Sequence, residues 1–289
     1  MAAGPPRMTA PAWILTLDCE DRPGIVAAVS GFLAARDGFI LDSQQYADLD
    51  SGRFFMRVEF KAVGAPFETA VLRADFAPVA ERFGFDWAMA ESNRFPRILI
   101  AVSRGSHCLN DLLHRWKTGG LGVEIAGVVS NHDTLRDLTE WHGLPFVLLP
   151  EDKASQEAAL LAEFDRADAD YLILARYMQI LSPALADRLA GRCINIHHSF
   201  LPGFKGARPY HRAHARGVKL IGATAHFVTG DLDEGPIIEQ AVERVDHRAS
   251  VDDMIRIGRD IEAQVLARAV QWIGARRVFR NGNRTIVFR

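Results

Sequence analysis

From Arg97 onward, short apolar runs alternate with stretches of helical periodicity. Five runs have the length of strands and are apolar at successive positions: RILIAV (97–102), VEIAGVVS (123–130), FVLLP (146–150), YLILA (171–175) and CINIH (193–197). Such strands, alternating with helices, are typical of a parallel sheet covered on both faces. We therefore predict an α/β, Rossmann-like domain with a mostly parallel sheet over residues 97–289. In such sheets, ligands bind beyond the carboxyl ends of the strands.

The first part of the chain has a different pattern. Residues 13–92 predict the order βαββαβ, in which two strand-like runs, 39–50 and 53–60, form a hairpin. The first helix is expected to start with Asp21 as its cap and Pro23 in its first turn. We thus predict a second, smaller domain over 13–92, a linker at 93–96 and a disordered start over 1–12.

Composition excludes several classes of protein. A formal net charge of −2 argues against a protein that binds nucleic acid by neutralising phosphates. No window has the roughly 20 apolar residues of a membrane span, and the first 13 residues lack the apolar core of a signal peptide. The three cysteines are far apart and resemble the reduced thiols of a cytosolic protein. We expect a cytoplasmic protein without nucleic-acid or membrane partners.

Polar side chains stand at the end of the strand CINIH. Because side chains alternate along a strand, Asn195 and His197 are expected to face the same side. A carboxamide offers two N–H donors and an imidazole exchanges a proton near neutral pH, so the pair suits an oxyanion developing on a carbonyl. The alternative is a strand end whose polar groups only bond nearby backbone.

An acidic turn, DLDEGP, follows the apolar run LIGATAHFV and contains Asp231 and Asp233. A carboxylate near His197 would orient the imidazole, raise its pKa and position a water molecule for attack. The alternative is an ordinary solvated turn. Five histidines raise the further alternative of a metal site: His197, His198, His211, His214 and His226. No cysteine or carboxylate stands at a familiar ligand spacing beside them, so we predict no metal.

The motifs ARYMQILSP, NIHHSFLP, HFV and DLDEGPII, in this order, resemble the folate-dependent formyltransferase fold between Pro96 and Trp272. The resemblance implies that Asn195, His197 and Asp233 carry catalysis, with Asp233 rather than Asp231 matching the family's turn. It also implies a segment whose backbone and apolar side chains hold the pterin ring: Tyr177, Met178, Gln179, Ile180 and Leu181. The alternative for that segment is a buried strand and helix start.

The βαββαβ order with DRPGI at the first helix resembles an ACT domain, a ferredoxin-like module that often senses amino acids. The resemblance implies that Asp21, Arg22 and Gly24 hold the carboxylate of an amino-acid effector, because free N–H groups at a helix start favour anions. It also implies a homo-oligomer. The alternative is a structural or oligomerising module without a ligand.

The acceptor of the formyl group depends on weaker signals. The loop VSRGSHCLNDLL (102–113) has one glycine, so it makes a poorer phosphate cradle than glycine-rich loops do. The ACT-like N-terminal region and the segment HHSFLPGFKGARPY resemble the formyltetrahydrofolate deformylases. That resemblance implies hydrolysis of 10-formyltetrahydrofolate to formate and tetrahydrofolate, which supplies formate to one-carbon and purine metabolism without a separate cofactor.

The sequence leaves two other functions open. One is a formyltransferase with an amine acceptor such as a phosphoribosyl glycinamide, and the other is a non-catalytic folate or amino-acid sensor. The tail RRVFRNGNRTIVFR predicts a hairpin with its turn at Asn281-Gly282 that either extends the sheet or serves an interface.

Overall fold

The structure, a computed structural model, describes residues 11–203 and 209–289. The first ten residues of the predicted disordered start lie outside the described residues, as do the first three residues of the GARPY segment. Two compact units make up the chain: one runs to Arg94 and includes Phe288–Arg289, and the other spans Phe95–Val287. The division falls within the predicted linker, 93–96.

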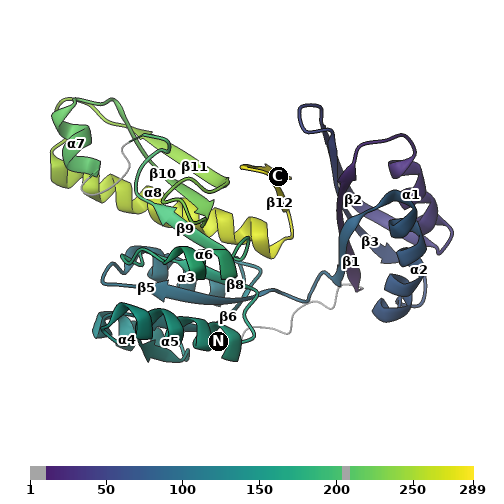
Figure 1. The fold of residues 1–289 in the computed structure, drawn as a ribbon, viewed down its shortest axis with the longest axis horizontal. Coiled ribbons are helices and arrows are strands. Elements are labelled where there is room, and N and C mark those ends of the chain that lie inside the picture. Colours follow the sequence, from purple (N-terminus) through teal and green to yellow (C-terminus); the bar gives the residue numbers. More distant parts are fainter. Residues whose placement is uncertain (1–10, 204–208) are drawn as a thin grey trace. The chain divides into compact units, whose positions relative to one another are not determined.

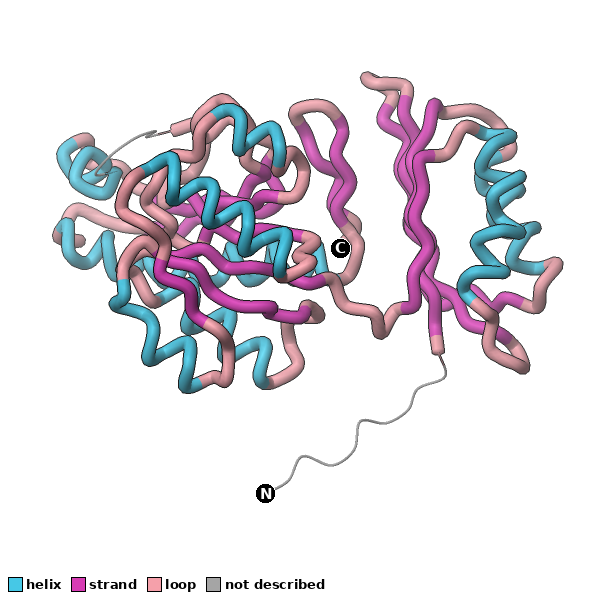
Figure 2. The backbone as a smooth tube through the Cα atoms, turned by 60° about the horizontal axis from the view of Figure 1, so that its bottom comes forward, coloured by secondary structure: helices cyan, strands magenta, loops and turns pink. Residues whose placement is uncertain are grey.

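The described part of the first unit has its strands and helices in the order βαββαβ: β1 (Ala12–Glu20), α1 (Ile25–Ala34), β2 (Gly38–Asp48), β3 (Arg53–Ala62), α2 (Thr69–Phe83) and β4 (Asp86–Glu91). The sheet has the order β2-β3-β1-β4, and every pairing in it is antiparallel. Both helices lie on one face of this sheet (Figure 2). Aromatic contacts such as Phe32 with Phe76 fill the layer between them.

The start of α1 differs from the prediction. Gly24, and not Asp21, is the N-cap residue, and no side chain caps the helix. Gly24 has φ +95, a left-handed conformation that residues with a Cβ rarely adopt. The chain therefore enters the helix through a glycine turn, and Pro23 lies just before the helix rather than in its first turn.

The second unit contains the remaining elements: β5 (Arg97–Val102), α3 (His107–Lys117), β6 (Glu124–Ser130), η1 (Asp133–Leu135), α4 (Arg136–Trp141), β7 (Phe146–Leu148), α5 (Lys153–Arg166), β8 (Tyr171–Leu174), α6 (Pro183–Arg188), β9 (Cys193–His197), α7 (Pro209–Ala215), β10 (Leu220–Phe227), β11 (Ile237–Arg244), α8 (Val251–Gly274), β12 (Val278–Asn281) and β13 (Arg284–Val287). Its seven-stranded sheet has the order β11-β10-β9-β8-β5-β6-β7 (Figure 1). The five neighbouring strands β9-β8-β5-β6-β7 run parallel, and β10 is antiparallel to both of its neighbours, β9 and β11. The predicted mostly parallel sheet is confirmed.

Strand β5 explains why the apolar runs were continuous. Its residues Ile98, Ile100 and Val102 are buried in a core that includes residues of α3 and α8. Leu99 and Ala101 are buried in a different core, which includes residues of α5 and α6. Because both faces of the strand are covered, neither set of positions can be polar. The chain order reverses at β5, whose neighbours are β6 and β8, and this is where such sheets bind ligands.

Two C-terminal features complete the unit. Helix α8 was absent from the prediction, although Ser250 and Asp253 form a capping box at its start. The predicted hairpin is present as β12 and β13, which form a separate two-stranded sheet instead of extending the large one. Thr285 of this hairpin donates a hydrogen bond to the backbone carbonyl of Ile237 in β11.

The three cysteines are free and buried. Within residues 11–203 and 209–289, no helix is long and apolar enough to cross a membrane.

Helix α8 packs closely at Gly258, where a Cβ would lie 2.0 Å from the Tyr210 hydroxyl oxygen. We expect Gly258→Ala to destabilise the protein by about 1–3 kcal/mol, because the buried tyrosine ring must move. Gly31 in α1 is the matched control, since its Cβ would meet nothing within 4 Å. Gly31→Ala should stabilise by about 0.4–1 kcal/mol. Urea denaturation measures both changes, and equal effects of the two substitutions would contradict the close packing.

Candidate active site

A cavity of about 290 Å³ opens beyond the carboxyl ends of β8 and β9. All eight residues that the sequence assigned to catalysis and pterin binding line it: Asn195, His197, Asp233, Tyr177, Met178, Gln179, Ile180 and Leu181. The segment 177–181 follows β8, Asn195 and His197 belong to β9, and Asp233 lies in the turn between β10 and β11. The fold therefore brings together side chains that are up to 56 positions apart in the chain.

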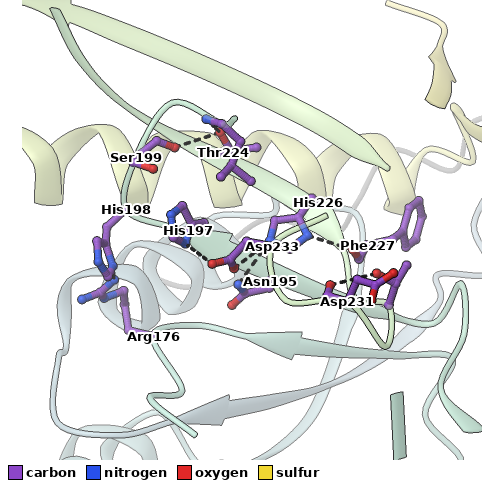
Figure 3. Close-up of polar contacts among 12 residues, drawn as sticks. Arg176, Asn195, His197, His198, Ser199, Thr224, His226, Phe227, Asp231 and Asp233 are labelled. Atoms are coloured by element: carbon purple, nitrogen blue, oxygen red, sulfur yellow. Dashed lines mark hydrogen bonds and ion pairs between the residues drawn. The ribbon is translucent and has the colours of Figure 1, made fainter. Parts of the chain in front are cut away.

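Asp233 is the centre of the polar contacts in this cavity (Figure 3). Its Oδ2 lies 3.2 Å from His197 Nδ1, and its Oδ1 lies 3.7 Å from His226 Nε2. The other imidazole nitrogen of His197, Nε2, is buried and has no hydrogen-bond partner within the described part of the chain. A neutral His197 that donates from Nδ1 to the carboxylate keeps a lone pair on Nε2, so this atom can accept a proton.

The turn that carries Asp233 requires unusual backbone geometry. Asp233 has φ +58, a left-handed conformation that aspartate tolerates better than most residues. At Gly235, a Cβ would lie 1.8 Å from the backbone carbonyl oxygen of Phe227, so only glycine allows the chain to return so closely. Asp231 also lines the cavity but is exposed. The turn therefore directs one of its two aspartates to the histidines.

His226 is a further residue of this site, although the sequence indicated it only as an alternative metal ligand. It lies directly opposite Asn195 in the antiparallel pairing of β9 and β10. Its Nδ1 is 2.8 Å from the Phe227 carbonyl oxygen, which can only accept a hydrogen bond. Nε2 of the neutral ring is therefore an acceptor, and Asn195 Nδ2, at 3.3 Å, donates to it. One N–H of the Asn195 carboxamide remains for a ligand.

Burial and the neighbouring charges set the protonation states of two of these groups. Burial lowers the pKa of His226, which favours the neutral ring that the Asn195 bond requires. Burial alone would raise the pKa of Asp233, but the hydrogen bond and charge of His197 outweigh it and lower this pKa overall. Asp233 is therefore a carboxylate at neutral pH.

Comparison with known proteins decides the family. The family model described as formyl transferase matches residues 96–270. A formyltetrahydrofolate deformylase from Corynebacterium sp. is 49% identical over 279 residues, which cover 96% of this chain and 98% of that protein. The chain belongs to the formyltetrahydrofolate deformylase family. A crystal structure of a formyltetrahydrofolate deformylase from Pseudomonas syringae superimposes with a TM-score of 0.94 at 47% identity, covering 98% of this chain and 96% of that one.

The deformylase family and the amine formyltransferases share only part of this fold. A glycinamide ribonucleotide transformylase from Symbiobacterium toebii superimposes with a TM-score of 0.62 at 27% identity, covering 95% of that chain but 68% of this one. The deformylases, in contrast, match nearly the whole chain, including the first unit. The catalytic fold alone thus does not separate the two activities.

His198, which the sequence indicated only as an alternative metal ligand, also belongs to this cavity. Its ring stacks on His197, with centroids 5.1 Å apart and planes 16° apart, and it lines the same cavity. Its Nδ1 accepts a hydrogen bond from the guanidinium of Arg176 (Figure 3). Burial and the charge of Arg176 lower the pKa of His198 to about 4. His198 is therefore a neutral ring with its proton on Nε2.

A histidine titration followed by NMR tests this assignment. We expect the His198 ring to stay neutral until about pH 4, whereas an unperturbed histidine protonates near pH 6.5. Because its folded pKa lies below its unfolded pKa, His198 contributes stability above about pH 6.5, and this contribution falls as the pH decreases toward 4. His198→Gln should remove that part of the pH dependence of stability. A His198 midpoint near 6.5 would contradict the contact with Arg176.

The predicted effector-binding residues belong to the first unit, apart from this cavity in the chain. Arg22 donates a hydrogen bond to the Arg82 carbonyl oxygen, and its guanidinium lies 5.0 Å from the centroid of the Phe83 ring. The backbone N–H of Asp21 donates to the Gly52 carbonyl oxygen. Asp21, Arg22 and Gly24 thus form one exposed loop at the start of α1.

Within residues 11–203 and 209–289, the histidines considered as metal ligands do not belong to a group of three or more potential ligands. Among the residues that the structure describes, one group of three has its potential ligand atoms within 4.8 Å of one another: His107, Cys108 and Glu262. Burial raises the pKa of Cys108 well above its usual value, which disfavours the thiolate that binds metals. Glu262 also already accepts hydrogen bonds from Tyr210 and pairs with Arg176.

Proposed function

We propose that the protein hydrolyses 10-formyltetrahydrofolate to formate and tetrahydrofolate. The main support is the match to a formyltetrahydrofolate deformylase at 49% identity over 96% of this chain. This match extends beyond the part of the fold that is shared with the amine formyltransferases. The cavity contains a histidine–carboxylate pair and a carboxamide, which are the groups that acyl transfer to water requires. Folate is the substrate, and no separate cofactor or metal takes part.

In this proposal, His197 activates the attacking water. The Nδ1–H of His197 donates a hydrogen bond to the Asp233 carboxylate, so the Nε2 lone pair is free to take a proton from water as the water oxygen attacks the formyl carbon. The imidazolium that forms is stabilised by the Asp233 carboxylate 3.2 Å away.

Asn195 stabilises the negative charge that develops on the formyl oxygen. Its carboxamide is oriented by His226, so its second N–H is available to the oxyanion. Protonated His197 then returns its proton to N10 as the C–N bond breaks. The new C–O bond becomes part of formate, and N10 leaves as the amine of tetrahydrofolate.

The pterin ring is held by the segment after β8. Residues 177–181 line the cavity together with apolar side chains of Leu174 and Val228. Tyr177 is buried and donates a hydrogen bond to Gln156, which fixes the start of the segment. Met178 and Ile180 are 58% and 61% exposed, so they offer apolar surface that a flat ring can cover.

Incubation of the purified protein with 10-formyltetrahydrofolate alone tests the function. We expect equal amounts of formate and tetrahydrofolate, measured by a formate dehydrogenase assay and by absorbance. Folate binding without formate release would support a sensor. Turnover that requires an added amine would support a transferase, and either result would contradict hydrolysis.

The first unit is proposed to be an ACT-like module that binds an amino-acid carboxylate at Asp21, Arg22 and Gly24 and joins copies of the chain into a homo-oligomer. Its βαββαβ order and the free backbone N–H groups at the start of α1 support this proposal. Light scattering tests the homo-oligomer, and isothermal titration with individual amino acids tests effector binding.

The formate that the protein releases would feed one-carbon and purine metabolism.

A further inference from the structure

A second cavity, of about 390 Å³, shares three lining residues with the first: Arg176, Met178 and Gln179. Its other walls come from the loop 103–107 after β5, from Asn131 and His132, and from Arg259 of α8. Within the described part of the chain, neither Arg104 nor Arg259 forms an ion pair. The second cavity therefore presents unpaired positive charge and suits an anionic group.

Arg176 stands between the two cavities in an unusual conformation. It follows β8 with φ +65, a left-handed geometry that side chains other than glycine adopt only at a cost in free energy. Its Nε lies 3.3 Å from Glu262 Oε2, and its guanidinium also donates to His198 Nδ1. Since its side chain is only 19% exposed, Arg176 fills space instead of extending into solvent.

Glu262 holds Arg176 in place from α8. This residue is 1% exposed, and its carboxylate also lies 2.9 Å from His107 Nε2 and 2.7 Å from the Tyr210 hydroxyl oxygen. Burial alone would raise the pKa of Glu262, but the bond to His107 and the charge of Arg176 lower it overall. A charged carboxylate with three partners holds the Arg176 side chain firmly. Arg176 therefore cannot move away from its place between the two cavities without breaking a buried ion pair.

We propose that Arg176 is a specificity-determining residue that restricts the formyl acceptor to water. Its anchored side chain closes the path from the cationic second cavity to Asn195 and His197. An amine whose anionic group binds near Arg104 and Arg259 cannot reach the formyl carbon, whereas water can. This inference rests on the proposed hydrolysis and explains how a fold shared with an amine transformylase yields formate.

The two reactions differ only in the nucleophile. With water, a C–O bond forms and the C–N10 bond breaks, one proton of the water goes to N10, and the other is released as formate leaves. With an amine, a C–N bond to the acceptor forms instead, the acceptor loses one proton and N10 gains one. The products are then a formamide and tetrahydrofolate, so no further reactant is needed. The ratio of formamide to formate therefore reports the acceptor directly.

The test uses the full chain and two amines, glycinamide and 2-aminoethyl phosphate. Arg176→Gly removes the wall and places glycine where φ is +65. The double variant R176G/E262Q also avoids leaving a buried carboxylate without its cation. Arg176→Lys is the matched control, because it keeps a long cationic side chain at the same position. Formamide and formate are quantified by mass spectrometry, and thermal melting reports folding.

The parent and Arg176→Lys should release formate and no formamide above the uncatalysed level. In Arg176→Gly or the double variant, the formamide fraction should exceed the uncatalysed level by about tenfold or more. It should also increase in proportion to the amine concentration. The rise should be larger for 2-aminoethyl phosphate if the cationic cavity binds its phosphate. A folded Arg176→Gly or double variant with the parent's product ratio would overturn the proposal, and so would catalysed formamide formation by the parent. Absence of formate from the parent would instead contradict the proposed hydrolysis.

Discussion

Asn195→Ala is expected to lower kcat for formate release by a factor on the order of 10² to 10³. In the proposed mechanism, the substitution removes the N–H that stabilises the oxyanion. Because the oxyanion is absent from the bound substrate, KM should change much less than kcat. His226, which accepts from Asn195 Nδ2 at 3.3 Å, keeps its bond to the Phe227 carbonyl oxygen and therefore its ring position. Single-turnover kinetics measure the loss in the chemical step.

Asn283→Ala is the control for this substitution, because Asn283 is exposed at the C-terminal hairpin. It should leave kcat within about twofold of the parent, as expected for a surface position. Circular dichroism and thermal melting should show both variants folded. A folded Asn195→Ala variant with nearly parental turnover would remove Asn195 from the mechanism.

Asp233→Asn is expected to lower kcat by a factor on the order of 10³ to 10⁴, which makes it the most damaging of these substitutions. The neutral amide cannot stabilise the imidazolium of His197. Its NH₂ group can also donate to His197 Nδ1, which would move the ring proton to Nε2 and block proton transfer from water. The volume of the side chain is nearly unchanged, so folding is retained.

Asp231→Asn is a closely matched control, since both aspartates lie in one turn and line one cavity. Asp231 is exposed, and its backbone carbonyl rather than its carboxylate accepts the hydrogen bond from Thr229. Its substitution should change kcat by less than about threefold. Comparable losses in the two variants would mean that the negative charge of the turn, and not the contact with His197, supports catalysis.

Local patterns were sufficient to predict much of the fold. Continuous apolar runs required a strand buried on both faces, and β5 is buried in two different cores as a result. Alternation along CINIH placed Asn195 and His197 on one wall of the cavity. The start of α1 was predicted wrongly, because a glycine turn at Gly24 replaced the expected Asp21 cap. Helix α8 was overlooked even though its capping box was readable.

The sequence by itself determined the order of the strands and of most helices, the resemblance to a formyl-transfer family and the three groups proposed to carry the chemistry, because these depend on short-range periodicity and on motifs. Only the tertiary structure decided which partners orient those groups. His226 lies opposite Asn195 through the register of two antiparallel strands, and Arg176 meets Glu262 from 86 positions away. Strand register and helix packing are set by the burial of the whole core, so no local pattern reports them.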